Sequence, residues 1–311
     1  MFYLMIWQVL MSLLIAFFAE ELNIDMPTWG LILVSQVLVF FLPSIVAILK
    51  NRKNIRDILP MQKLGIKNII MILAMTLTIQ PIVMVISATF ASFFGNDIGE
   101  IVAGIQQDTN LWITLAIVAI VPSIFEELAL RGVVYSGYKK IDIKKAAVIN
   151  GLFFAMVHMN LQQFLYAFIL GALFCYFVYY TKSIWSAIWA HFALNASQVM
   201  LMALFPGNNI DEQYIGQEIL EAGMQNLHLI VSIIFISIIV LGFLALFIGI
   251  YIAFKNYNSI RNLQLATDKD IAKEDEDNNQ NEKVITLGFW GSTIIFVAIM
   301  GLFWLAQTNL I

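Results

Sequence analysis

The stretch "VPSIFEELALRGVVY", residues 121–135, holds three charged side chains in an otherwise almost wholly apolar run. Such a run belongs in lipid or in a packed core, where a charge is costly and generally marks a functional site. Residues four apart share a helix face, so Glu127 and Arg131 can pair, whereas Glu126 points about 100° away from Glu127. One carboxylate can therefore neutralise the arginine while the other stays free for chemistry.

The composition of the chain indicates a membrane environment. Of its 311 residues, 60% are hydrophobic and 12% are charged, whereas soluble domains are about 25% charged. The net charge of −4 offers no basic surface, so we expect no nucleic-acid partner. The single cysteine, Cys175, excludes an intrachain disulfide, and we expect it to serve packing.

The apolar runs predict an all-α fold, a polytopic transmembrane helical bundle of about eight or nine spans. A span needs about 20 apolar residues, so the shortest run, 146–159, is the weakest of them. The runs are 1–19, 30–49, 68–94, 111–135, 146–159, 163–181, 183–205, 228–254 and 285–308.

The basic residues predict the orientation of this bundle. Of 17 Lys and Arg, all but Arg131 fall in 50–67, 139–145, Lys182 and 255–283. The segments 20–28, 95–110, 160–162 and 206–227 contain none. Counting spans puts every basic segment on one side, which is the positive-inside pattern. We therefore expect a multi-pass protein of the cell membrane with a cytoplasmic N-terminus and an outside C-terminus.

Three parts are expected along the chain. Residues 1–255 form the membrane-embedded helical core. The polar stretch 256–284 reads as a flexible charged cytoplasmic linker, and 285–311 as a C-terminal transmembrane span. The acidic outside segment 206–227 reads as a solvated loop or a short amphipathic helix.

Other polar side chains join the charged run inside the spans. His158 ends the fifth run, and His191 and Asn195 lie four apart in the seventh. At about 1.5 Å per residue from the cytoplasmic ends, Glu126 lies about 18–20 Å deep, His158 about 18 Å, and the other two about 10–17 Å. Three helices thus bring a carboxylate, two imidazoles and an amide to similar depth.

This set of groups is suited to activating water, in either of two ways. Glu126, His158 and His191 can bind zinc and leave a position open for water. Without metal, a glutamate alone can activate water while His and Asn stabilise the oxyanion. Taken singly, Glu127–Arg131 is as well explained as a packing ion pair, and each histidine as an interhelical hydrogen bonder. Their joint occurrence favours a site.

Three motifs resemble those of a known family. "EELALR" (126–131), "FAMVH" (154–158) and "HFALN" (191–195) have the forms EExxxR, FxxxH and HxxxN. In this order they are similar to the CPBP family, also called the CAAX protease and bacteriocin-processing, or Abi, family of intramembrane proteases. The resemblance implies a membrane endopeptidase whose partners are the lipid bilayer and a membrane-associated peptide or protein substrate.

The resemblance also implies roles for the motif residues. Glu126 would activate water, His158, His191 and Asn195 would complete the site, and Glu127 would belong to the catalytic set with Arg131 and Phe154 in support. The prenylated CAAX substrate is not carried over. The alternatives are a non-catalytic scaffold or bacteriocin-immunity protein of the same fold, and a small-solute transporter, which the lack of an internal repeat disfavours.

Overall fold

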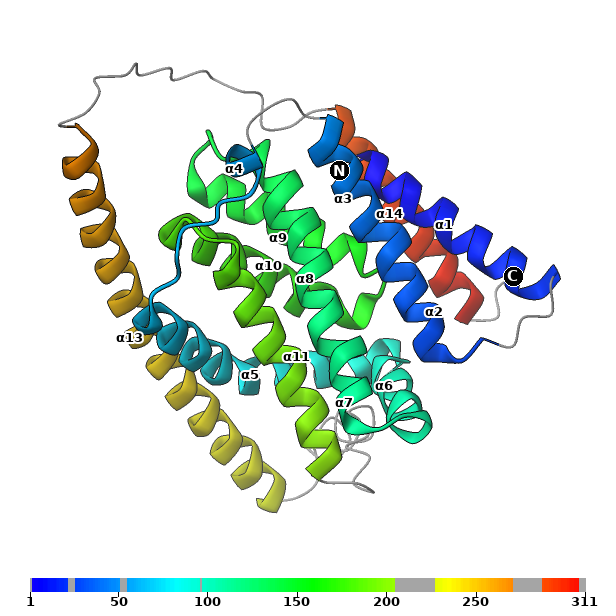
Figure 1. The fold of residues 1–311 in the computed structure, drawn as a ribbon. Coiled ribbons are helices and arrows are strands. Elements are labelled where there is room, and N and C mark those ends of the chain that lie inside the picture. The colour runs from blue at the N-terminus through cyan, green and yellow to red at the C-terminus, as the bar shows by residue number, and fades with distance from the viewer. Residues whose placement is uncertain are drawn as a thin grey trace.

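The computed structural model describes residues 2–21, 26–50, 55–95, 97–204, 227–270 and 287–307. Within these ranges the regular structure is helical, apart from one isolated bridge between Met61 and Ser183 (Figure 1). In chain order, with η marking π-helical segments, the elements are α1 (Phe2–Glu21), α2 (Thr28–Ser35), η1 (Gln36–Phe41), α3 (Leu42–Lys50), α4 (Ile55–Ile58), α5 (Ile66–Phe94), α6 (Asp97–Asp108), α7 (Leu111–Thr114), η2 (Leu115–Ile120), α8 (Val121–Glu127), η3 (Leu128–Val134), α9 (Ile143–Val157), α10 (Leu161–Thr181), α11 (Trp185–Leu204), α13 (Leu227–Asp270) and α14 (Leu287–Gln307).

Each of the predicted apolar runs coincides with a helix or with a continuous series of helical segments. In the described part of the chain, six of these are long and apolar enough to cross a membrane. Shorter apolar helices cover Tyr3–Ile15 and Phe289–Leu302, and the weakest predicted run forms α9, of 15 residues. The chain is therefore a polytopic helical bundle, as predicted.

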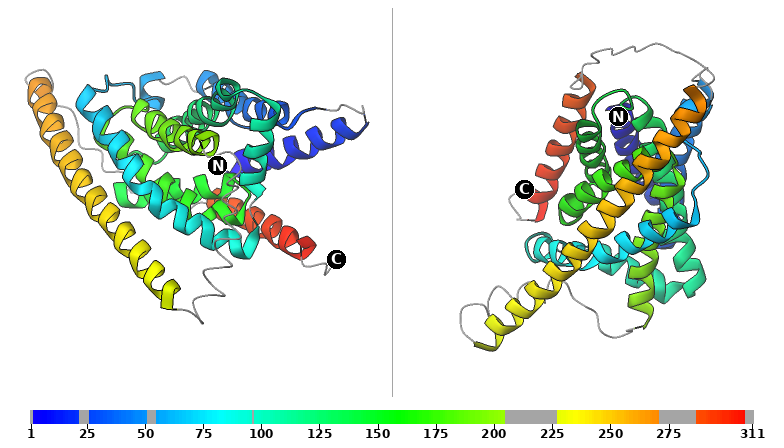
Figure 2. Two further views of the ribbon diagram at one scale, coloured as in Figure 1. Left: turned by 90° about the horizontal axis from the view of Figure 1, so that it is seen from below. Right: turned by 90° about the vertical axis from the view of Figure 1, so that its left-hand side faces the viewer.

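The helices surround a centre made by α8, α9, α10 and α11. Figures 1 and 2 show α13 along one edge of the bundle and the neighbouring helices α1 and α14 at the opposite edge. Two hydrophobic clusters fill the space between them. One joins α5, α9, α10, α11 and α13, and the other joins α1, η1, η3, α9, α10 and α14.

Proline shapes the two composite spans that face each other beside this centre. Pro43 and Pro122 each follow a π-helical segment, η1 and η2 respectively. Proline has no N–H to donate, so the carbonyl four residues earlier loses its usual helical partner. π-helical turns are uncommon and often occur at functional sites. These segments thus carry backbone carbonyls that side chains from other helices can reach.

Two glycines allow α9 and α10 to pack closely. A Cβ added at Gly171 would lie 2.7 Å from the Cβ of Phe154 and 2.9 Å from the Cα of Gly151. A Cβ added at Gly151 would lie 2.5 Å from the carbonyl oxygen of Phe168. Real Cβ atoms do not approach other atoms so closely, so a larger residue at either position would force the helices apart. Phe154 is therefore held directly against α10.

The prediction of a flexible linker over 256–284 is wrong for its first part, because residues 256–270 are helical and belong to α13. Asn258 is fully buried and exchanges two amide hydrogen bonds with Asn68 of α5, at 2.8 and 3.1 Å. Asn262 donates to the carbonyl of Tyr180. Amides that resemble a polar linker in the sequence are thus partners in helix packing. Residues 271–284, like most of the predicted outside loop 206–227, lie outside the described residues.

Candidate active site

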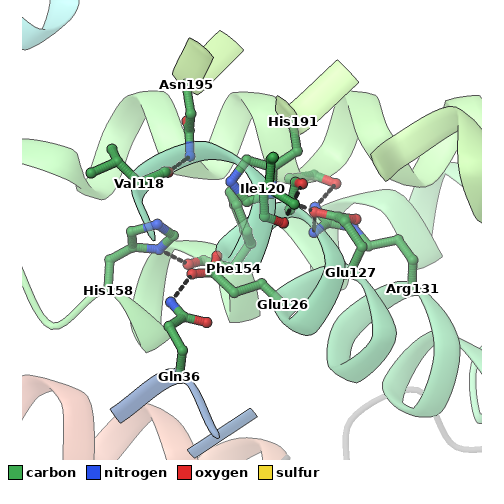
Figure 3. A network of polar contacts seen from close by, with 12 residues as sticks. Gln36, Val118, Ile120, Glu126, Glu127, Arg131, Phe154, His158, His191 and Asn195 are labelled. Carbon is green, nitrogen blue, oxygen red and sulfur yellow. Dashed lines mark hydrogen bonds and ion pairs between the residues drawn. The ribbon is translucent and has the colours of Figure 1, made fainter. Parts of the chain in front are cut away.

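The polar residues singled out in the sequence gather where α8, η3, α9 and α11 meet (Figure 3). Glu126 and Glu127 end α8 and Arg131 lies in η3. His158 caps the C-terminus of α9, and His191 and Asn195 lie on α11. Glu126, Glu127, Arg131 and His191 are buried. The structure divides them into two groups around Phe154.

The first group is centred on Glu127, and we call it the Glu127 group. Its Oε1 accepts hydrogen bonds from Arg131 Nη1 at 2.8 Å and lies 2.9 Å from His191 Nδ1. Arg131 also donates from Nη2 to the carbonyl of Gly171 at 3.0 Å. The predicted Glu127–Arg131 pair is confirmed, with both side chains fully buried. Pairing removes the large cost of an isolated buried charge.

The second group is centred on Glu126, and we call it the Glu126 group. Gln36 of η1 donates from Nε2 to Glu126 Oε1 at 2.8 Å. The other oxygen, Oε2, is buried and has no hydrogen-bond partner among the described residues. His158 Nδ1 lies 2.6 Å from the carbonyl oxygen of Phe154, and Figure 3 shows the His158 ring near the Glu126 side chain. Glu126 is thus held at one oxygen and available at the other.

Phe154 stands between the two groups. Its ring centroid lies 4.7 Å from that of His158 and 5.6 Å from that of His191. The guanidinium carbon of Arg131 lies 4.4 Å from the same centroid, which is a cation–π distance. One ring thus contacts both histidines and the arginine. The supporting role of Phe154 stays a prediction that these contacts are consistent with.

Asn195 donates a hydrogen bond to a backbone carbonyl one turn before Pro122. Its Nδ2 donates to the carbonyl of Val118 at 3.0 Å. Val118 lies four residues before Pro122, so its carbonyl lacks the usual helical donor. One hydrogen of the Asn195 amide thus joins α11 to η2, and the second hydrogen remains for another acceptor.

Glu126, His158 and His191, the predicted zinc ligands, do not converge on one point. His191 approaches Glu127 rather than Glu126. Among the residues that the structure describes, no group of three or more His, Cys, Asp or Glu side chains is placed to hold a metal ion. As arranged, these side chains do not fit a zinc site. Zinc binding stays a prediction, and the reaction proposed below has no step on zinc.

A cavity of about 670 Å³ lies between α2, the end of α6 and the segment α7–η2. Its apolar wall includes Trp29, Leu33, Ile117 and Val121, and Asp108 lines it together with neighbouring polar residues. Leu33 lies one turn before Gln36 and Val121 about one turn before Glu126. Two residues that line the cavity thus lie about one helical turn along the chain from Gln36 and Glu126.

Gln36 is a site residue that the sequence analysis missed. Gln36 carries no charge, so it is not among the ionisable groups that mark the spans. The available signal was a glutamine within the apolar run 30–49, since a buried amide needs a hydrogen-bond partner. Nothing local identifies that partner, because Glu126 is 90 residues away in the chain.

Comparison with known proteins gives a match over the part of the chain that carries the three motifs. Residues 108–197 match the family described as Type II CAAX prenyl endopeptidase Rce1-like. A 96-residue part of the chain is 33% identical to "Putative membrane peptidase YdiL" of Bacillus subtilis (strain 168). That match covers 30% of this chain and 39% of the relative, so the chain spans well under half the length of that protein. No solved structure matches the chain.

The matched region contains Glu126, Glu127, Arg131, His158 and the α11 pair of His191 and Asn195. Gln36 lies outside it. The family match thus spans the residues of all three motifs, which the helices bring together. Through residues 108–197, this chain is similar to the Type II CAAX prenyl endopeptidase Rce1-like family of membrane proteins.

Proposed function

We propose that this protein is an intramembrane endopeptidase that hydrolyses a peptide bond in a membrane-associated peptide or protein. The observation that carries the proposal is the state of Glu126. It is a buried carboxylate with one oxygen held by Gln36, the other oxygen without a partner among the described residues, and a histidine beside it. A carboxylate so placed is suited to act as a general base.

The reaction follows from the free atoms of the Glu126 group. Nδ1 of His158 lies against the carbonyl of Phe154 and so carries the ring hydrogen. Nε2 is then free to accept a hydrogen bond from the attacking water. The water oxygen bonds to the peptide carbonyl carbon while its proton moves to Glu126 Oε2. The C–N bond then breaks as that proton passes to the leaving amine. The products are a carboxylic acid, which keeps the second proton of the water until it ionises, and an amine, with Glu126 regenerated.

The α11 pair supports the intermediate of this reaction. The second amide hydrogen of Asn195 is a donor for the tetrahedral oxyanion, and the His191 ring lies one helical turn before it on α11. Glu127 and Arg131 hold the His191 ring through its Nδ1. In this proposal Glu127 is a positioning residue, and Glu126 is the carboxylate that reacts.

Unpaired polar atoms around the two groups also support hydrolysis. Beyond Glu126 Oε2, the buried atoms without a hydrogen-bond partner in the described chain include Gln36 Oε1, Glu127 Oε2 and Arg131 Nε. Buried polar atoms are normally hydrogen-bonded, to protein or to ordered water. The site therefore has hydrogen-bonding capacity for water and for a peptide backbone.

Contacts between segments that carry Lys and Arg support the predicted orientation. The backbone N–H of Gln62 donates to the carbonyl of Lys182, and Arg261 donates to the carbonyl of Lys63. Three Lys/Arg-bearing segments that are far apart in the sequence thus lie together at one end of the bundle. We propose that this end faces the cytoplasm of a cell-membrane protein, in line with the positive-inside pattern.

Cleavage in isotopically labelled water tests the proposal. We expect purified protein in vesicles to cleave members of an internally quenched lipopeptide library. In H₂¹⁸O each new carboxyl group should gain one ¹⁸O, measured by mass spectrometry of the products. His191→Ala is expected to lose this activity while inserting into membranes normally. Equal cleavage by wild type and His191→Ala, or no cleavage by wild type of any library member, would refute the endopeptidase reading.

The zinc prediction has its own measurement, independent of any substrate. It expects near-stoichiometric zinc in detergent-purified wild type and its loss from the His158→Ala/His191→Ala double variant. Metal content by mass spectrometry decides it, with Glu100→Gln on the exposed face of α6 as a control. Zinc that persists in the double variant would be bound elsewhere, and zinc absent from wild type would leave the glutamate mechanism.

A further inference from the structure

We propose that α1 and η1 form a clamp that positions Glu126 and His158 for catalysis. This inference rests on the proposed function, and it assigns a role to a part of the chain outside the family-matched region 108–197. The clamp consists of three side chains, Trp7, Gln8 and Gln36. Each makes a hydrogen bond to a different helical segment at or near the Glu126 group.

Gln36 is the part of the clamp that touches the reacting carboxylate. It is buried, and its amide donates to Glu126 Oε1 at 2.8 Å. A hydrogen bond to a charged acceptor restricts the carboxylate to one orientation. With Oε1 held, Oε2 is the oxygen that can meet water. Gln36 thus sets which oxygen of Glu126 acts as the base.

Trp7 holds the segment that carries Gln36. Its indole Nε1 donates to the carbonyl of Leu38 at 2.7 Å, two residues beyond Gln36 in η1. π-helical segments are uncommon and are maintained only where their surroundings support them. The half-buried Trp7 therefore fixes the π-helical backbone that aims Gln36 at Glu126.

Gln8 holds the other member of the catalytic pair. Its Nε2 donates to the carbonyl of Val157 at 2.5 Å, immediately before His158. The last carbonyls of a helix lack helical donors and need partners from elsewhere. Gln8 supplies such a donor at the end of α9, where the His158 ring begins. Adjacent residues of α1 thus secure both sides of the Glu126 group.

Packing makes α1 rigid enough for this role. Met5 is fully buried in the hydrophobic cluster that also contains Phe40 of η1 and Phe153 of α9. α1 also packs against α14, which contributes Phe296 to the same cluster. The first and last helices of the described chain therefore support the catalytic pair from the same side. The inference also gives the C-terminal span a task, namely to hold α1 in place.

Variants that keep side-chain size and remove only the donor test the clamp. The probe is the quenched lipopeptide that wild type cleaves fastest in vesicles. We expect Gln36→Met to lower kcat about 100-fold, the size of effect that a misplacement of about 1 Å can have, with KM within about twofold of wild type. Trp7→Phe and Gln8→Met are expected to lower kcat about tenfold, again with little change in KM.

Matched controls lie on α1 and on the composite span that contains η1. Ser44→Ala, in α3, removes only a hydrogen bond to the carbonyl of Phe40 one turn earlier in the same span, and Ser12→Ala changes an exposed position of α1. Both should retain wild-type kcat. If Gln36→Met also retains it while Glu126→Gln is inactive, the clamp is refuted and the endopeptidase stands.

A second readout does not need activity. Dicyclohexylcarbodiimide enters membranes and modifies carboxyl groups, and peptide mass spectrometry reports the rate at Glu126. Gln36→Met should raise that rate several-fold, because the carboxyl group loses its fixed partner, whereas Ser44→Ala should not. An unchanged labelling rate at Glu126 would overturn the clamp even if no substrate were found. Because labelling does not depend on cleavage, this readout tests the clamp separately from the endopeptidase activity.

Discussion

Replacing Glu126 by glutamine should lower the rate of peptide cleavage by about 100- to 10,000-fold, the contribution of a well-placed general base. Glutamine has nearly the same shape and can still accept the hydrogen bond from Gln36 through its carbonyl oxygen. It cannot take a proton from water. Initial rates of lipopeptide cleavage measure the effect, together with membrane insertion and thermal unfolding, which should stay close to wild type.

The control for this variant is Glu100→Gln, which makes the same substitution at an exposed position of α6. It should leave cleavage unchanged. If Glu126→Gln cleaves as fast as wild type, Glu126 is not the base and the mechanism fails. If instead wild type has a biological phenotype that Glu126→Gln retains in full, the non-catalytic scaffold of the same fold becomes the better reading.

Breaking the buried ion pair should cause the largest loss of stability. Arg131→Met leaves Glu127 without its positive partner, and Glu127→Gln leaves a fully buried arginine without its negative one. Removing one member of a buried pair costs about 3–5 kcal/mol, because the remaining charge stays buried and unpaired. We expect either variant to express poorly or to unfold at a much lower denaturant concentration in detergent.

The double variant Glu127→Gln/Arg131→Met separates stability from function. Without either charge it should recover much of the stability that the single variants lose, since apolar or neutral replacements of a buried pair are often tolerated. It should remain poorly active, because His191 loses the carboxylate beside its Nδ1. Lys145→Met, which removes an exposed charge, is the control for both measurements. Additive losses in the double variant would contradict a direct coupling between Glu127 and Arg131.

Several features of this protein follow from the sequence because they are local. Hydropathy alone identifies the helices that lie in the membrane, since each span must satisfy its own backbone hydrogen bonds. The Glu127–Arg131 pair follows from the spacing of four residues on one helix. The order and spacing of the three motifs indicate the resemblance to the CPBP family, because each motif is a local pattern along the chain. His158 at the end of its helix also follows from where the apolar run stops.

Only the tertiary structure decides which faces of different helices meet. Periodicity places His191 on one face of α11, and packing brings that face to Glu127 instead of Glu126. Gln36 finds Glu126 across 90 residues, and Asn258 finds Asn68 across 190. Asn195 reaches the Val118 carbonyl that Pro122 leaves without its helical donor.

These contacts depend on how closely the helices approach one another, which small residues such as Gly151 and Gly171 allow. A hydrogen bond between distant helices adds nothing to the pattern of either helix, so the sequence determined the reactive groups and the structure decided how they are held.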